Sequence, residues 1–74
     1  MKYKRNLMLA AIDLIVMQRA ASGVIKRKDI ISLLAHSDEA KDYKIGSIYS
    51  AVDNALRLLV NNKNIRRIYP GEYK

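Results

Sequence analysis

The sequence predicts one mainly α-helical domain, made of three helices and a short two-stranded β-hairpin. Three observations lead to this fold class. The chain has 74 residues, which allows a single domain. Three apolar segments have the composition or spacing of helices, and residues 65–74 combine an alternating segment with a turn signal. The domain therefore spans residues 1–74, with a basic N-terminal arm over 1–5 and the hairpin over 65–74.

The first predicted helix covers residues 5–21 and ends at Ser22-Gly23, where glycine is a favoured C-terminal cap. Apolar side chains surround nearly its whole circumference, and only Asp13, Gln18 and Arg19 interrupt them. A helix that is apolar all round has to be buried on more than one side. We therefore expect a homodimer that pairs through this helix. The expected interface residues are Leu7, Met8, Ala11, Ile12, Ile15 and Val16.

The second predicted helix follows a possible short strand at residues 24–25 and begins at the basic run 26–28. Asp29 is suited to the unpaired N–H groups of the first helical turn. Ile30, Leu33 and Leu34 have the one-sided spacing of a surface helix, and His36 is expected to close it. The polar residues 37–44 are expected to form a loop with one helical turn over 38–41.

The third predicted helix, residues 44–62, has the clearest pattern in the chain. Its apolar residues step by three and four positions along more than four turns, at Ile45, Ile48, Val52, Ala55, Leu56 and Leu59. The opposite face is polar. Asparagines at positions 61, 62 and 64 weaken the helix and end it. Residues 65–69 then alternate like a strand, Pro70-Gly71 suits a turn, and residues 72–74 suffice for a short return strand.

The charge of the chain indicates a polyanionic partner. Fourteen Lys and Arg against seven Asp and Glu leave a formal net charge of +7, which is a strong positive field for so small a domain. Nucleic acid is the commonest partner of such a domain, an anionic membrane surface is the rival, and a merely soluble basic protein is the plainest alternative.

Other classes of protein have little support in the sequence. Residues 1–23 imitate a secretory signal, but Asp13 interrupts their apolar stretch, which is also too short to cross a bilayer. The chain has no cysteine, which excludes disulfides and thiolate metal sites. His36 is the only histidine, and neither metal-ligand spacing nor a glycine-rich phosphate loop occurs. We expect a cytoplasmic protein that is not an enzyme and needs no cofactor, metal, membrane or small-molecule substrate.

The order of helix, short strand, helix, turn, long helix and basic hairpin resembles the winged helix-turn-helix family. Residues 56–67 are similar to that family's usual end of the recognition helix, with Leu56 and Leu59, a polar turn, then Ile65 and two arginines. Two features depart from the family pattern: no glycine occurs near Lys63, and the hairpin, or wing, is short. The build is similar to small, often dimeric regulators of archaea and of their viruses and plasmids.

The resemblance implies a transcriptional regulator that binds double-stranded DNA sequence-specifically as a homodimer. A helix fits the major groove of B-DNA, and the N-terminal half of a recognition helix reads base edges there. The expected base-reading residues are Ser47, Ser50, Asn54 and Arg57. The expected contacts to phosphates, some through the wing, are Lys26, Arg27, Lys28, Lys44, Tyr49, Arg66, Arg67 and Lys74. Strand alternation would point Arg66 and Arg67 to opposite faces.

Two alternative functions stay open at this point. Winged helices also serve as protein–protein adaptors, in which case the apolar first helix would be the partner surface. The five tyrosines and the positive charge also allow non-specific binding of RNA or single-stranded DNA by base stacking. Half-buried rings with hydrated hydroxyl groups are the simpler explanation of the tyrosines.

Overall fold

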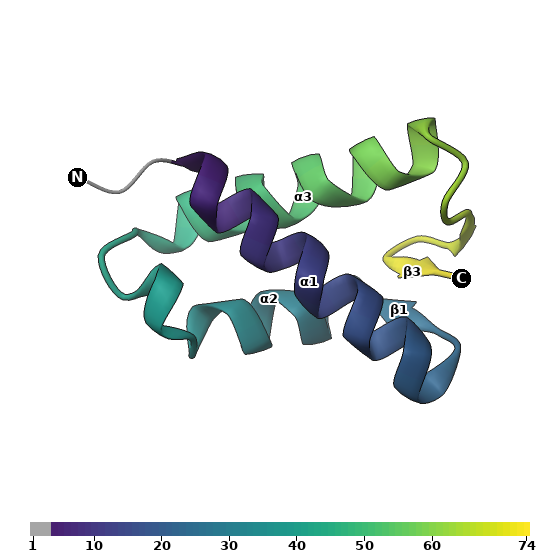
Figure 1. Cartoon of the computed structure of the whole chain (residues 1–74), viewed down its shortest axis with the longest axis horizontal. Coiled ribbons are helices and arrows are strands. Elements are labelled where there is room, and N and C mark those ends of the chain that lie inside the picture. The colour runs from purple at the N-terminus through teal and green to yellow at the C-terminus, as the bar shows by residue number, and fades with distance from the viewer. Residues whose placement is uncertain (1–3) are drawn as a thin grey trace.

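The computed structural model describes the backbone of residues 4–74, and the side chains from residue 7 onward. This part of the chain forms three α-helices and a small three-stranded antiparallel sheet (Figure 1). In chain order the elements are α1 (Lys4–Ser22), β1 (Ile25–Lys26), α2 (Arg27–Ala35), the 3-10 helix η1 (Asp38–Ala40), α3 (Ile45–Asn61), β2 (Arg67–Tyr69) and β3 (Glu72–Tyr73). Residues 4 and 5 of the expected N-terminal arm are thus helical, and its residues 1–3 lie outside the described part.

Helix α1 buries one stripe of its surface inside the protein's own core. Leu7, Ala11 and Ile15 are fully buried, and their spacing of four residues places them on one side of the helix. Figure 1 shows α1 crossing in front of both α2 and α3, so two helices cover this stripe. The expectation that these three residues form a dimer interface is therefore wrong. Because α1 is apolar around nearly its whole circumference, the sequence pattern does not indicate which side of the helix packs against the rest of the chain.

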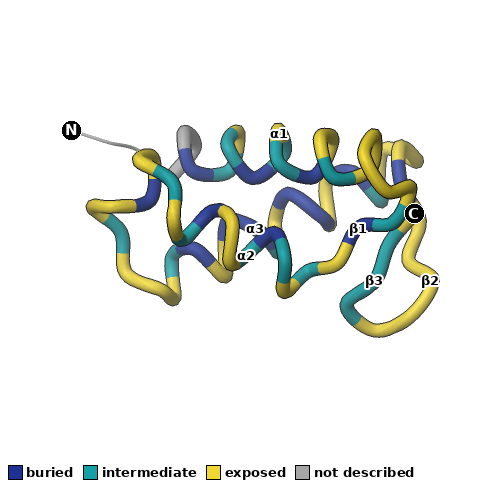
Figure 2. The backbone as a smooth tube through the Cα atoms, turned by 90° about the horizontal axis from the view of Figure 1, so that it is seen from below, coloured by how far each residue is buried: buried dark blue, intermediate teal, exposed yellow. Residues whose placement is uncertain are grey.

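The outer side of α1 keeps an apolar surface that nothing in the described chain covers. Leu9, Val16 and Met17 are 48, 56 and 65% exposed, and Ile12 is half-buried beside them. In Figure 2 this helix lies along one edge of the molecule with its outer side exposed. Asp13 is also exposed on this side, in the middle of the apolar residues. Of the expected interface, Met8, Ile12 and Val16 thus remain at least partly accessible.

Helix α3 is the central element of the core, and its observed bounds agree with the prediction. Lys44 is its N-cap and Asn62 its C-cap. The helix buries the predicted residues Ile48, Val52, Ala55, Leu56 and Leu59, and Ala51 in addition. Ile45 is an exception, because the first turn of α3 extends beyond the core and leaves this side chain exposed.

Helix α2 and the segment after it also follow the local signals. Ile30 and Leu34 are buried, whereas Leu33 is exposed on the outer side of α2. His36 is the C-cap, as expected, and its backbone N–H and its Nδ1 both lie within hydrogen-bond distance of the Ser32 carbonyl oxygen. The expected helical turn within residues 38–41 is η1.

The sheet has one strand more than the predicted hairpin. Its order is β1-β3-β2, with Ile25 opposite Tyr73 and Lys26 opposite Glu72. Strand β1 pairs with the edge of β3, whose backbone groups would otherwise lack partners, and this pairing accompanies complete burial of Ile25. The turn has Gly71 at a φ of 78°, which is the value that a type II turn requires after a proline. Its carbonyl accepts a 2.8 Å hydrogen bond from the Arg27 N–H, which ties the turn to the start of α2.

The end of α3 shows how the chain turns without the glycine that the family pattern contains. Lys63 has a φ of 62°, in the left-handed region that glycine occupies most easily. The N–H of Lys63 donates to the Val60 carbonyl at 3.0 Å and that of Asn64 to the Leu59 carbonyl at 2.9 Å. These two bonds form a Schellman motif, a helix end in which glycine is the usual residue at this position. Here a lysine adopts a conformation that is unfavourable for any residue with a Cβ atom.

We expect Lys63→Gly to raise the free energy of unfolding by about 1 kcal/mol, because it removes the cost of a left-handed conformation at a residue with a side chain. Lys63→Ala is the matched control: it removes the same charge but keeps the Cβ atom, so it should bring no comparable gain. Chemical denaturation followed by circular dichroism measures both. Equal stability of the two variants would contradict the backbone explanation.

Candidate nucleic-acid interface

The outward face of α3 carries a row of polar side chains. Ser50, Asn54 and Arg57 are spaced by four and three residues, so they share one side of the helix, and all three are exposed. Ser47 lies at the margin of this row and is half-buried. Within the described residues, the side chains of Ser50, Asn54 and Arg57 have no hydrogen-bond or ion-pair partner. Four polar residues that the sequence predicted as base readers thus lie together on one helix.

Arg27, predicted as a phosphate contact, has partners inside the protein. Its Nε donates to Asp53 Oδ1 at 2.6 Å and its Nη2 to Asp53 Oδ2 at 3.1 Å, which makes a bidentate ion pair. The hydrogen bond to Asp53 raises the pKa of Arg27 above its ordinary value, and burial opposes this only in part. The guanidinium carbon also lies 5.6 Å from the centre of the Tyr49 ring, within the range of a cation–π contact.

The Arg27–Asp53 pair joins the first residue of α2 to the middle of α3. The residues are 37% and 43% exposed in their side chains, so water screens the pair and its contribution to stability is small. Sequence reasoning missed Asp53, which is the only acidic residue of α3. The available signal was its position four residues after Tyr49 and four before Arg57, at the edge of the polar row.

The other predicted cations at the start of α2 and α3 are open to solvent. Lys26, Lys28 and Lys44 are exposed, and none of them has an ion-pair partner in the part of the chain that is described. Lys26 and Lys28 border a groove of about 330 Å³ beside the hairpin turn, where Glu72 is the one acidic side chain. The Lys26 N–H donates to Gln18 Oε1 at 2.9 Å, which fixes its backbone to α1.

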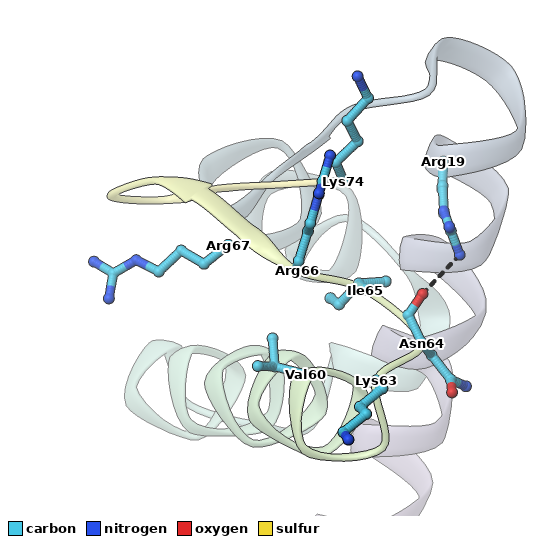
Figure 3. A pocket seen from close by; sticks show the side chains of 8 residues that line it. All are labelled: Arg19, Val60, Lys63, Asn64, Ile65, Arg66, Arg67 and Lys74. Carbon is cyan, nitrogen blue, oxygen red and sulfur yellow. Dashed lines mark hydrogen bonds between the residues drawn. The ribbon is translucent and has the colours of Figure 1, made fainter.

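The hairpin separates its two arginines. Figure 3 shows Arg67 extending away from Arg66 and Lys74, as strand alternation predicts. Arg67 shares a shallow pocket of about 310 Å³ with Asp53 and Arg57 of α3, so it belongs to the same surface as the polar row. Arg66 and Lys74 are directed elsewhere and do not line that pocket.

A basic surface lies at the junction of α1, the end of α3 and the base of the hairpin. It is an open cleft of about 560 Å³ that we call the basic cleft (Figure 3). Its lining residues are Arg19, Val60, Lys63, Asn64, Ile65, Arg66, Arg67 and Lys74. Arg19 Nη1 donates to the Asn64 carbonyl at 2.9 Å across the cleft. Sequence reasoning missed Arg19 and Lys63 as members of any site, because 44 residues separate them along the chain.

The tyrosines divide between the surface and the interior. Tyr49 and Tyr69 are exposed, and Tyr43 and Tyr73 are half-buried. Tyr3 lies outside the described residues. Tyr49 of α3 contacts Arg27, and Tyr69 is on the hairpin, so the two exposed rings belong to different elements.

Comparison with protein-family models, with curated proteins and with solved structures gives no match. Among residues 4–74, none of the helices has the length and hydrophobicity that crossing a membrane requires. The same residues contain no group of three or more histidine, cysteine or acidic side chains arranged to hold a metal ion.

Proposed function

We propose that this chain is a winged helix-turn-helix protein that binds double-stranded DNA sequence-specifically, with α3 in the major groove. The observation that carries the proposal is the outward face of α3. Ser50, Asn54 and Arg57 lie there exposed and without partners among the described residues. Polar groups in this condition bond only water in the free protein and are available for base edges. The order of helices and strands and the hairpin beside α3 support the same proposal.

The chemistry of these side chains suits base reading. Asparagine can pair with adenine through two hydrogen bonds, serine accepts or donates to several bases, and arginine prefers guanine. Helix α3 has 17 residues and is about 25 Å long, so its N-terminal half can enter the groove while the rest remains outside. Lys44 at its start, Lys26 and Lys28 on α2, and Arg67 on the hairpin flank it and would neutralise phosphates.

We further propose that the chain acts as a homodimeric transcriptional regulator in the cytoplasm. The exposed outer side of α1, with Leu9, Ile12 and Val16, supports pairing of two copies, because isolated domains of this size gain stability by burying such residues. Two α3 helices about 34 Å apart would then fit successive major grooves of a palindromic site.

Selection of a preferred site from a random duplex pool, followed by binding measurements on that site, tests the proposal. Asn54→Ala should reduce the preference over an altered site by about 1–3 kcal/mol, the usual loss when a bidentate base contact is removed. Asn61→Ala is the matched control. It truncates the same residue type on the exposed C-terminal turn of α3, outside the half that enters the groove, and should leave the preference unchanged.

Arg67→Ala should weaken binding to all duplexes alike and make the negative slope of log K against log salt shallower by about 0.9, as the loss of one phosphate contact does. A wild-type chain that selects no duplex site, or an Asn54→Ala variant that keeps the wild-type preference, would contradict sequence-specific reading by α3. Stronger competition by single strands than by duplex would favour the stacking alternative.

A further inference from the structure

The basic cleft gathers positive charge without compensation. Five cationic side chains line it, from the end of α1, the α3–β2 loop and the hairpin, and none of the eight lining residues is acidic. All five cationic residues are exposed. Mutual repulsion among them is unfavourable in the absence of an anion, although water screens these exposed side chains in part.

Two backbone features hold these charges together at a cost to stability. The N–H of Arg66 donates to the Lys74 carbonyl at 3.0 Å, and the N–H of Lys74 donates back to the Arg66 carbonyl at 2.8 Å. The two residues are thus directly opposite each other, an arrangement in which like charges destabilise a hairpin. Figure 3 shows their side chains running alongside each other. Lys63 adds a further charge from a left-handed conformation that a glycine would adopt more easily.

Arg19 completes the cleft from the side of α1. One of its N–H groups is fixed to the Asn64 carbonyl, which orients the guanidinium and leaves its other donors available. A phosphate group is the anion whose oxygens best match such a fork together with neighbouring ammonium groups. Strain that is concentrated where charges converge is typical of a ligand site.

We propose that the basic cleft binds backbone phosphates of nucleic acid, as a site separate from the outward face of α3. The inference rests on the proposed function, because it takes nucleic acid as the partner. Arg67 lines both the basic cleft and the pocket beside Asp53 and Arg57, so it borders both sites. Arg66 and Lys74 point away from Arg67 and line only the cleft. One chain then contacts the phosphate backbone of the duplex at two positions. The first lies beside the groove that α3 enters, and the second is held by the basic cleft.

Anisotropy measurements on a duplex of about 20 base pairs at several salt concentrations test this assignment. Arg66→Gln and Lys74→Gln should each make the negative slope of log K against log salt shallower by about 0.9. The factor by which each substitution weakens duplex binding relative to the wild type should be about threefold greater at roughly 50 mM salt than at roughly 200 mM. The preference for one sequence over another should stay as in the wild type, because α3 is untouched. Lys41→Gln is the matched control, an exposed lysine next to η1 at the other end of the molecule.

A titration followed by NMR tests the site without relying on recognition of a particular DNA sequence by α3. Duplex added to the Asn54→Ala variant should shift the backbone amides of Asn64, Arg66 and Lys74, and inorganic pyrophosphate should shift the same amides. Cleft variants that behave like Lys41→Gln, while the wild type binds duplex, would overturn this inference and leave the proposed function standing. A wild-type chain that ignores duplex while its cleft amides respond to pyrophosphate would overturn the nucleic-acid assignment together with the proposed function.

Discussion

Replacing Ile15 with alanine should lower the free energy of unfolding by about 3 kcal/mol, whereas the neighbouring Val16→Ala should change the stability of the monomer by less than about 0.5 kcal/mol. Ile15 is fully buried beneath α2 and α3, so truncation removes apolar contacts and leaves a cavity. Val16 is 56% exposed on the outer side of α1. A loss of 3 kcal/mol is a large part of the stability available to a domain of this size, so Ile15→Ala should be partly unfolded near room temperature.

Chemical denaturation at two protein concentrations measures the free energy of unfolding of both variants. The comparison separates the stability of the monomer from the contribution of dimerisation. If α1 pairs two copies through its outer side, stability rises with concentration in the wild type, and Val16→Ala weakens that dependence. Sedimentation then shows a lower fraction of dimer for Val16→Ala. Equal losses of monomer stability for the two variants would contradict the burial of only one stripe of α1.

Asp53→Asn should strengthen binding to any duplex by about tenfold at low salt, comparable with the gain of one further phosphate contact. Asp53 is the only acidic residue on α3, and its carboxylate holds the Arg27 guanidinium. The substitution removes a charge that repels phosphates and releases Arg27 toward them. The cost in stability should stay below about 1 kcal/mol, because both side chains of the pair are partly exposed.

Glu39→Gln is the matched control for this prediction. It changes the net charge by the same amount, but Glu39 is exposed on η1, beyond the other end of α2 from Arg27. Anisotropy measurements at several salt concentrations compare the two variants with the wild type. Identical gains for both variants would mean that net charge alone governs affinity and that Asp53 has no special place on the binding surface.

The candidate site was partly predictable from the sequence because its main part lies on one helix. Local spacing determines which side of α3 is polar, so Ser50, Asn54 and Arg57 were identified together from the sequence alone. The Arg27–Asp53 pair was not identified, because the start of α2 meets the middle of α3 only after the helices pack. The basic cleft depends on contacts between Arg19 and the segment around Asn64, 45 residues apart, which no local pattern encodes.

By itself, the sequence determined the elements whose signals are local. These are the bounds and buried stripe of α3, the helical turn at η1, the closure of α2 at His36 and the turn at Gly71. Only the tertiary structure decided which side of α1 is buried, because a helix apolar all round has no preferred face until α2 and α3 cover one. It also decided that β1 extends the hairpin into a three-stranded sheet, since a two-residue strand has no partner preference of its own. Periodicity specifies a face within one element, whereas pairing between elements depends on packing of the whole chain.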